Sequence, residues 1–222
     1  MKKTVKGTST NLKSIDSSQK DLQIPRKSRI RENIEAILVA ILLALLIRTF
    51  FVQAFKIPSG SMKQTLQIGD HILVNKFIYG IKIPFLRNVI VPFKQPKRGD
   101  IIVFKFPVDP DKDFIKRVIG LAGDRVEGRD KKIYVNHKPI EDDFSIRMDP
   151  QSGLQPRDNF GPITVPGNAL FVMGDNRDSS YDSRFWGFVD LKVVSGKAFM
   201  IYWSWDQKNI GVRWKRIGKI LK

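Results

Sequence analysis

The chain has 222 residues, 42% of them hydrophobic, which is enough for one domain with its own core and excludes a wholly disordered protein. Its formal net charge of +17 indicates an anionic partner, which is nucleic acid, acidic lipid or both. The absence of cysteine excludes disulfides, thiol nucleophiles and thiolate metal sites.

The first segment of the chain is strongly basic. Residues 1–31 contain nine Lys and Arg residues against two Asp residues, together with many Ser, Thr, Asn and Gln residues. Such a segment has too few apolar side chains to fold by itself. We therefore predict a disordered leader over residues 1–33. Its positive charge favours the cytoplasmic side of any membrane that the next segment crosses.

An apolar run from Ala36 to Phe55 comes next and contains one charged residue, Arg48. Its 20 residues match the length that a helix needs to cross a bilayer. We therefore predict a transmembrane anchor over residues 34–55, with residues 56–222 on the extracytoplasmic side. One alternative is a buried core helix, because only 12 residues are uninterrupted. The other is a removable signal peptide, although no Ala-x-Ala-like site follows the run.

The remaining residues predict a β-rich body. Short runs of β-branched, leucine and aromatic residues are separated by Gly, Pro, Asn and Asp turn signals, without a helical period of useful length. The clearest predicted strands are Asp70–Phe77, Asp100–Phe106, Phe114–Leu121, Lys132–Val135, Ala169–Met173 and Ala198–Trp203. This pattern indicates a mainly β fold, built as an antiparallel β-sheet or small barrel. The polar, proline-containing stretch of about 127–166 is expected to form a smaller inserted subdomain.

The most informative chemistry lies in Pro58-Ser59-Gly60-Ser61-Met62 and in Phe114-Ile115-Lys116-Arg117. Lys116 has apolar neighbours, so a strand can direct its amine into a dry site. Desolvation lowers the pKa of a lysine, and only the neutral amine can accept the proton of a serine hydroxyl. These residues therefore indicate a serine nucleophile with a lysine base. The alternative for Lys116 is an ordinary lysine at a strand edge.

A third polar cluster, from Met173 to Arg184, directly follows an apolar strand. Its alternating Asp and Arg residues are suited to a buried scaffold of ion pairs that holds a hydroxyl against the lysine amine. A calcium loop is the alternative, but the EF-hand spacing is absent. His71 and His137 do not have the spacing of a zinc site, and each is expected to be a surface or turn residue.

Five motifs in order resemble those of type I signal peptidases, the leader peptidases that are Ser-Lys dyad serine proteases. They lie behind the apolar segment and cover most of the chain: Pro58–Met62, Gly69–Lys76, Lys97–Phe104, Phe114–Asp124 and Gly174–Arg184. The resemblance implies a membrane-anchored serine endopeptidase that removes signal peptides. It implies that Ser61 is the nucleophile and Lys116 the general base.

Supporting roles follow from the same resemblance. Ser59 matches the hydroxyl that forms the oxyanion hole together with the Ser61 backbone N–H. Ser180 matches the serine that orients the lysine. Asp182 and Arg184 match a supporting ion pair. The family needs neither a metal nor a cofactor for this chemistry.

The resemblance also implies the substrate and the location. Signal peptides of exported preproteins carry small residues one and three positions before the cut. The positions that resemble those shaping the corresponding shallow apolar pockets are Ile57, Met62, Leu66, Phe114 and Ile115. The implied location is a bacterial-type cell membrane, crossed once with the N-terminus in the cytoplasm. One departure is Gln64, where the family often has proline, and we expect this change to loosen the turn slightly.

Other protein classes fit less well. Penicillin-recognising enzymes use Ser-x-x-Lys, but Gln64 stands three residues after Ser61. A self-cleaving repressor would have a DNA-binding helical domain in place of the apolar segment. The main alternative is a basic membrane-associated binding protein without catalytic activity. Its phosphate contacts would come from Arg213–Arg216 and its stacking surfaces from tryptophans. No RNA-binding motif accompanies these residues, so we expect anionic membrane lipid rather than nucleic acid as the partner.

Overall fold

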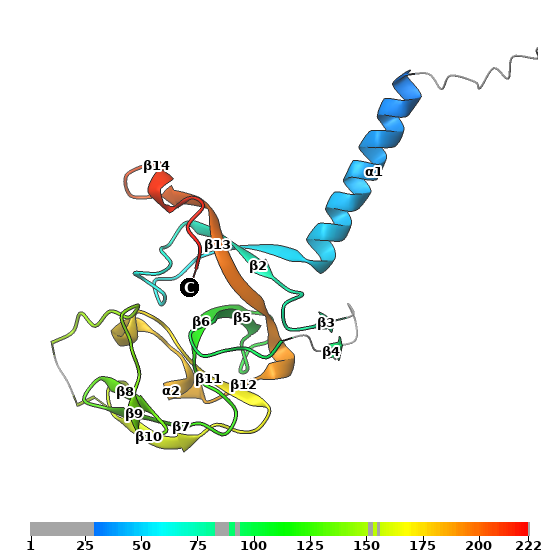
Figure 1. The fold of residues 1–222 in the computed structure, drawn as a ribbon. Coiled ribbons are helices and arrows are strands. Elements are labelled where there is room, and N and C mark those ends of the chain that lie inside the picture. The colour runs from blue at the N-terminus through cyan, green and yellow to red at the C-terminus, as the bar shows by residue number, and fades with distance from the viewer. Residues whose placement is uncertain (1–28, 83–88, 92–93, 151–152, 155, 222) are drawn as a thin grey trace, which may run out of the picture. The chain divides into compact units, whose positions relative to one another are not determined.

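The computed structural model describes residues 29–82, 89–91, 94–150, 153–154 and 156–221. Most of the basic leader predicted over residues 1–33 lies outside these ranges. The first element is helix α1, Arg29–Phe50 (Figure 1). Within the described ranges, no helix is both long enough and apolar enough to cross a membrane.

An eight-stranded sheet is the larger sheet of the body (Figure 1). In spatial order its strands are β1 (Val52–Lys56), β2 (Asp70–Asn75), β13 (Val194–Asp206), β5 (Ile101–Lys105), β6 (Asp113–Gly120), β11 (Ala169–Met173) and β12 (Val189–Asp190), with β14 (Gly211–Val212) paired to β13. All of these pairs are antiparallel. The prediction of a mainly β, antiparallel fold with few helices is therefore confirmed.

Strand β1 occupies residues that the sequence assigned to the apolar anchor. Helix α1 ends at Phe50, and Val52–Lys56 pairs in register with residues 71–75 of β2. The apolar character of the sequence continues across this boundary. The backbone groups change partners there, from their own helix to a strand that follows later in the chain. Strand β1 leads directly into the Pro58–Met62 segment.

A smaller four-stranded sheet lies between β6 and β11 in the sequence. Its spatial order is β10 (Phe160–Thr164), β7 (Arg125–Arg129), β8 (Lys132–Val135) and β9 (Lys138–Pro139). A short hairpin pairs β3 (Ile81–Lys82) with β4 (Val89–Val91). The short helical turns are η1 (Arg177–Ser179), α2 (Ser183–Trp186), η2 (Leu191–Val193) and η3 (Trp214–Arg216).

Three clusters of buried side chains form the core, and β6 contributes to each of them. Ile115 packs against the first cluster, which contains Met62 and Leu66. Val118 belongs to the second cluster and Ile119 to the third, which joins the two sheets. Burial of this much apolar surface on both faces of β6 fixes the strand firmly. The strand that carries Lys116 is therefore one of the best-anchored elements of the body.

Candidate active site

Ser61 and Lys116 lie side by side, although 55 positions separate them in the sequence. The Lys116 Nζ donates a hydrogen bond of 2.8 Å to the Ser61 Oγ. Ser61 lies in a series of turns between β1 and β2, one of which is closed by a bond from the Lys63 N–H to the Gly60 carbonyl. The distance between amine and hydroxyl lies within the range required for proton transfer between a nucleophile and its base.

Burial lowers the pKa of the Lys116 amine, which favours the neutral form that can accept a proton. The residue is only 4% exposed. Loss of water around the ammonium lowers the pKa of Lys116 from 10.5 to about 8, assisted by the positive charge of Arg184 and opposed by the negative charge of Asp182. The amine also lies 5.3 Å from the centroid of the Phe114 ring. At mildly alkaline pH a large fraction of Lys116 is therefore neutral and able to accept a proton.

A second hydroxyl, that of Ser59, lies beside the pair. The Ser59 Oγ is 3.5 Å from the Ser61 Oγ, on the same turn-rich segment. Gly60 separates the two serines and leaves the backbone between them open, since a Cβ built there meets no atom within 4 Å. No other part of the described chain covers the backbone at Gly60 on this side.

A cavity of about 650 Å³ opens beside the dyad. Its lining comes from the segment Phe55–Met62, the start of β6, and three side chains of the polar cluster Met173–Arg184, which is called the polar loop below. Four of the five apolar residues expected to shape substrate pockets line it, namely Ile57, Met62, Phe114 and Ile115. Leu66 is instead fully buried in the first core cluster. A hydroxyl, a buried amine and an apolar surface therefore face the same cavity.

Comparison with known protein families identifies the family of this chain. The family described as "Signal peptidase, peptidase S26" matches residues 30–203. The chain belongs to the signal peptidase family. It is therefore a serine endopeptidase, a hydrolase that processes signal peptides.

Two relatives from bacteria agree with this assignment, and one solved structure is similar in part. Signal peptidase I of Pseudomonas aeruginosa is 36% identical over 215 residues, which span 80% of this chain and 75% of the relative. Signal peptidase I of Leptolyngbya laminosa is 38% identical over 184 residues, spanning 79% and 81% of the two chains. A crystal structure of a signal peptidase I from Enterococcus faecalis is 34% identical, covers 47% of this chain and 97% of its own, and superposes with a TM-score of 0.39.

An ion pair of this signal peptidase lies behind the dyad in the polar loop. The Asp182 carboxylate accepts hydrogen bonds from the Arg184 Nε at 2.8 Å and from the Gly174 N–H at 3.0 Å. Arg184 also donates to the carbonyls of Arg157 and Arg177, at 2.8 and 2.7 Å. Both charges are buried, so their mutual pairing is needed to offset the loss of water. The pair therefore ties two parts of this loop, at Gly174 and Arg177, to the turn at Arg157.

Ser180 is buried close to the dyad, but its Oγ has no hydrogen-bond partner among the described residues. The hydrogen bond expected between Ser180 and the lysine amine is therefore not formed in this conformation. Space around the hydroxyl is tight because Gly174 passes beside it. A Cβ at Gly174 would lie 2.2 Å from the Ser180 Oγ and 2.5 Å from the Ser61 carbonyl oxygen. Only glycine permits the loop to approach the nucleophile segment this closely.

Asn176 is a site residue that sequence reasoning missed. Its N–H donates to the Ser61 carbonyl at 3.0 Å, and its Nδ2 donates to the Gly60 carbonyl at 3.1 Å. The polar loop thereby holds the backbone of the segment Pro58–Met62, called the nucleophile segment below, although Asn176 and Ser61 are 115 positions apart. Its position within the Gly174–Arg184 motif could have marked it as a site residue. Residue spacing, however, does not predict a contact between positions this far apart in the sequence.

A buried ion pair next to Lys116 in the sequence was also not predicted. Arg117 donates to both carboxylate oxygens of Asp175, at 2.9 and 2.8 Å, and to the Gly99 carbonyl at 2.7 Å. The same carboxylate accepts a bond of 2.5 Å from the Thr65 hydroxyl. These contacts connect β6, the polar loop and the end of the nucleophile segment. They also argue against calcium at this loop, because the carboxylate is already occupied by protein donors.

The described residues contain no group of three or more His, Asp or Glu side chains placed to hold a metal ion. His71 lies in β2, with its ring 5.8 Å from that of Tyr202. His137 lies in the turn before β9 with a φ of 67°. Neither histidine lines the cavity beside the dyad.

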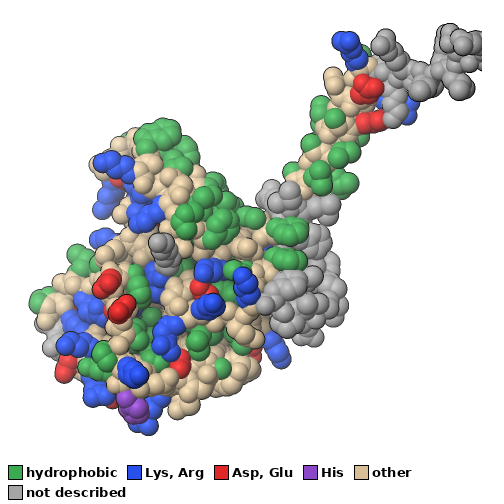
Figure 2. Space-filling view, in the orientation of Figure 1, with side chains coloured by type: hydrophobic (Ala, Val, Ile, Leu, Met, Phe, Trp, Pro, Cys, Tyr) green, Lys and Arg blue, Asp and Glu red, His purple; other side chains and the backbone are tan. Residues whose placement is uncertain are grey.

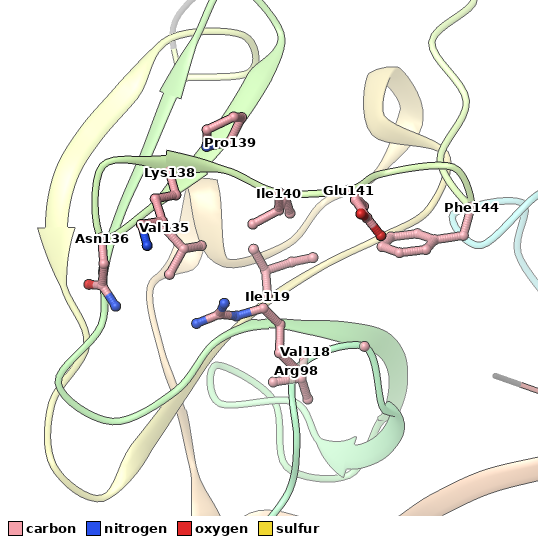
Figure 3. Close-up of a pocket in the computed structure, with 11 residues that line it drawn as sticks. Arg98, Val118, Ile119, Val135, Asn136, Lys138, Pro139, Ile140, Glu141 and Phe144 are labelled. Atoms are coloured by element: carbon pink, nitrogen blue, oxygen red, sulfur yellow. The ribbon is translucent and has the colours of Figure 1, made fainter.

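A second cavity, of about 580 Å³, involves strands of both sheets (Figure 3). Its lining residues are Arg98, Gly99, Val118, Ile119, Val135, Asn136, Lys138, Pro139, Ile140, Glu141 and Phe144. None of the residues predicted to be catalytic is among them. This cavity is therefore not a candidate for the peptidase chemistry.

Proposed function

We propose that the chain cleaves preproteins with Ser61 as the nucleophile and Lys116 as the general base. The observation that carries this proposal is the 2.8 Å contact between the Lys116 Nζ and the Ser61 Oγ, made by a buried lysine with a lowered pKa of about 8. A buried neutral amine within hydrogen-bond distance of a hydroxyl is the arrangement that activates a weak nucleophile.

The first step forms an acyl-enzyme. The neutral amine of Lys116 accepts the proton of the Ser61 hydroxyl while the Oγ attacks the scissile carbonyl carbon. The negative charge on the carbonyl oxygen is stabilised by the Ser59 hydroxyl and the Ser61 backbone N–H, each donor contributing about 2.7–4 kcal/mol. The C–N bond then breaks, and the Lys116 ammonium returns its proton to the leaving amine.

The second step reverses the roles with water. Lys116, neutral again, accepts a proton from a water molecule that attacks the acyl carbon. The ester bond to the Ser61 Oγ breaks, and the lysine returns the proton to that oxygen. Carboxylate product and free enzyme result, and the same base has served both halves of the reaction.

The buried polar loop supports this chemistry through position rather than proton transfer. We assign the pair Asp182 and Arg184 to holding the loop in shape, on the strength of its burial and its bonds to three segments. Ser180 is assigned to orienting the lysine, which requires its hydroxyl to turn or the amine to move once substrate binds. Catalytic hydrogen bonds that are long or absent without substrate commonly tighten in the complex.

The substrate pockets are proposed on the apolar side of the cavity. Ile57, Met62 and Ile115 would contact the small side chains one and three positions before the cut, with Phe114 beside them and Leu66 filling the space behind. A shallow pocket of this kind rejects large side chains by overlap. Small residues before the cut would therefore be required.

The anchor and its orientation are also proposals. Residues 34–50 of α1 would attach the protein to a bacterial-type cell membrane, with the leader 1–33 in the cytoplasm and the body outside. The last residues that the sequence assigned to the anchor belong to the body instead, because strand β1 (Val52–Lys56) pairs with β2. Apolar side chains exposed on α1 support this, among them Ile37, Leu38 and Leu42, each more than half exposed. Within the body, the stretch of about 127–166 would form the smaller subdomain, consistent with the separate pairing of β7 to β10.

A membrane-facing rim on the body is proposed near the end of β13. Trp203 and Trp205 are each 37% exposed and Trp214 is 72% exposed, and the rings of Trp203 and Trp214 lie 6.3 Å apart. Figure 2 shows hydrophobic side chains gathered at the end of the body that carries β14, with Lys and Arg side chains beside them. Tryptophan with adjacent basic residues suits the headgroup region of an anionic leaflet.

The experiment that tests the proposed function is cleavage of a preprotein carrying an Ala-x-Ala site by detergent-solubilised protein. We expect the wild type to cut after the second alanine, and Ser61→Ala and Lys116→Ala to be folded but inactive. Activity retained by both variants would refute the dyad. Failure of the wild type to cut would favour the non-catalytic binding protein.

A carbonate and high-salt extraction of membranes tests the anchor in parallel. An integral anchor keeps the protein in the membrane fraction under both conditions. Release by high salt alone would show that only electrostatic attraction between the membrane-facing rim and anionic lipid holds the protein, and would contradict the anchor.

A further inference from the structure

The start of β6 borders the active-site cavity along an edge that another strand can join. Residues 113–116 pair with β5 on one side, whereas the pairs between β6 and β11 begin at Arg117. An extended peptide bound at the Ser-Lys site of the proposed function can add to this edge through backbone hydrogen bonds. Its successive side chains then point to opposite faces of the sheet.

The two faces of β6 differ at this point. Ile115 packs against the first core cluster, together with Ile57 and Met62, whereas Phe114 packs against the second cluster. Small substrate residues one and three positions before the cut are expected on the Ile115 face. The substrate residue between them is therefore directed toward the Phe114 face, because side chains on neighbouring strands share faces in register.

Aromatic rings form the wall on that face. Phe114 stacks on Phe106 with centroids 4.2 Å apart and planes 4° apart, and Tyr181 meets Phe106 edge-on at 6.2 Å. Phe114 and Tyr181 both line the cavity. Tyr181 is 55% exposed, so much of its ring is available to a ligand. Aromatic surfaces of this kind favour large apolar and aromatic partners.

We propose that Tyr181 is a specificity-determining residue of this peptidase. Together with Phe114 it receives the side chain of the second residue before the scissile bond. It thereby favours a large apolar or aromatic side chain at the middle position of the Ala-x-Ala site. This inference rests on the proposed function, since it requires a peptide aligned on β6 with its scissile carbonyl at Ser61.

The test uses one preprotein in three forms, with Phe, Gly or Asp at the middle position and all other residues unchanged. The kcat/KM of each form is measured with detergent-solubilised full-length wild type, Tyr181→Ala, Tyr181→Phe and Tyr202→Ala. The ratio of kcat/KM between the Phe and Gly forms is the readout. A general loss of folding or of dyad activity affects both forms alike and cancels in this ratio. Tyr202→Ala is the matched control, because Tyr202 is an exposed tyrosine outside the cavity lining.

For the wild type we expect the Phe form to be cut about 3- to 10-fold more efficiently than the Gly form, the range expected for one aromatic contact. Tyr181→Ala should reduce this ratio at least threefold, whereas Tyr181→Phe and Tyr202→Ala should preserve it. A wild-type ratio near one, preference for the Asp form, or an unchanged ratio in Tyr181→Ala would each overturn the inference while leaving the peptidase intact. Absence of cleavage of every form by the wild type would instead refute the proposed function, and the inference with it.

Discussion

Replacing Lys116 by methionine should make the protein inactive but more stable at neutral pH. Methionine has a similar length and no charge, so it can occupy the buried site without a proton. The pKa of Lys116 falls from 10.5 to about 8 in the folded protein, a difference that corresponds to about 3 kcal/mol of lost stability when the lysine is protonated. Methionine avoids this penalty, but loss of the hydrogen bond to Ser61 lowers the stability of the variant by about 1 kcal/mol. The net expectation is a free energy of unfolding about 2 kcal/mol higher for Lys116→Met.

The pH dependence of this difference is the decisive part. Below pH 8 the lysine is protonated in both the folded and unfolded states, so the folded wild type bears the full penalty of a buried charge. Between pH 8 and 10.5 the folded protein has released the proton while the unfolded chain still binds it, and the stability of the wild type rises with pH. The advantage of Lys116→Met should therefore shrink over this interval. Above pH 10.5 only the lost hydrogen bond remains, and the variant should be slightly less stable.

The assay is guanidinium unfolding in detergent, followed by tryptophan fluorescence at pH 7, 9 and 10.5. Lys132→Met is the matched control, since Lys132 is an exposed lysine on β8 and its replacement should change stability little at any pH. If Lys116→Met differs from the wild type by the same amount at all three pH values, the amine is not desolvated. The explanation of its lowered pKa, and with it the argument for a neutral base, would then be wrong.

Other consequences can be measured directly. The kcat/KM for preprotein cleavage should rise with pH and level off above about 8, because only the neutral amine of Lys116 accepts a proton; a flat profile from pH 6 to 9 would contradict the assignment. Arg117→Met should lower the free energy of unfolding by about 3–5 kcal/mol, as the Asp175 carboxylate is left buried without its partner. Adding Asp175→Leu should recover more than half of this loss in denaturant unfolding, and no recovery would refute the pairing as the cause. Gln64 has a φ of 89°, so Gln64→Gly should stabilise the protein by about 1 kcal/mol and Gln64→Pro should destabilise it, as judged by thermal unfolding; the reverse order would contradict this backbone geometry.

The conformation of Gln64 also revises an expectation from the sequence. The family often has proline at this position, and glutamine was expected to loosen the turn slightly. The φ of 89° lies in the left-handed region, which proline cannot adopt because its ring holds φ near −65°. In this chain the segment after Ser61 therefore takes a turn that excludes the family's usual residue. A single sequence gives no sign of this, since φ depends on how Thr65 and Leu66 are held by the rest of the body.

The residues proposed as nucleophile and base could be identified from the sequence because both lie in short segments with distinct local chemistry. Ser61 follows a Pro and Gly-containing turn, and Lys116 interrupts an apolar strand, so each stands out against its neighbours. The mainly antiparallel fold was predictable for a similar reason, as strand composition and turn residues are local signals. The end of α1 was not, since the pairing of β1 with β2 depends on residues about 20 positions away.

The sequence by itself determined which residue types are available for the proposed chemistry and in which order they occur, because residue type and spacing are written in the chain. Only the tertiary structure decided how they act on one another. Contact between Ser61 and Lys116, the hold of Asn176 on the nucleophile segment and the aromatic wall at Tyr181 all join residues far apart in sequence. The lowered pKa of Lys116 also depends on the tertiary structure, because the residues packed around the amine remove its water.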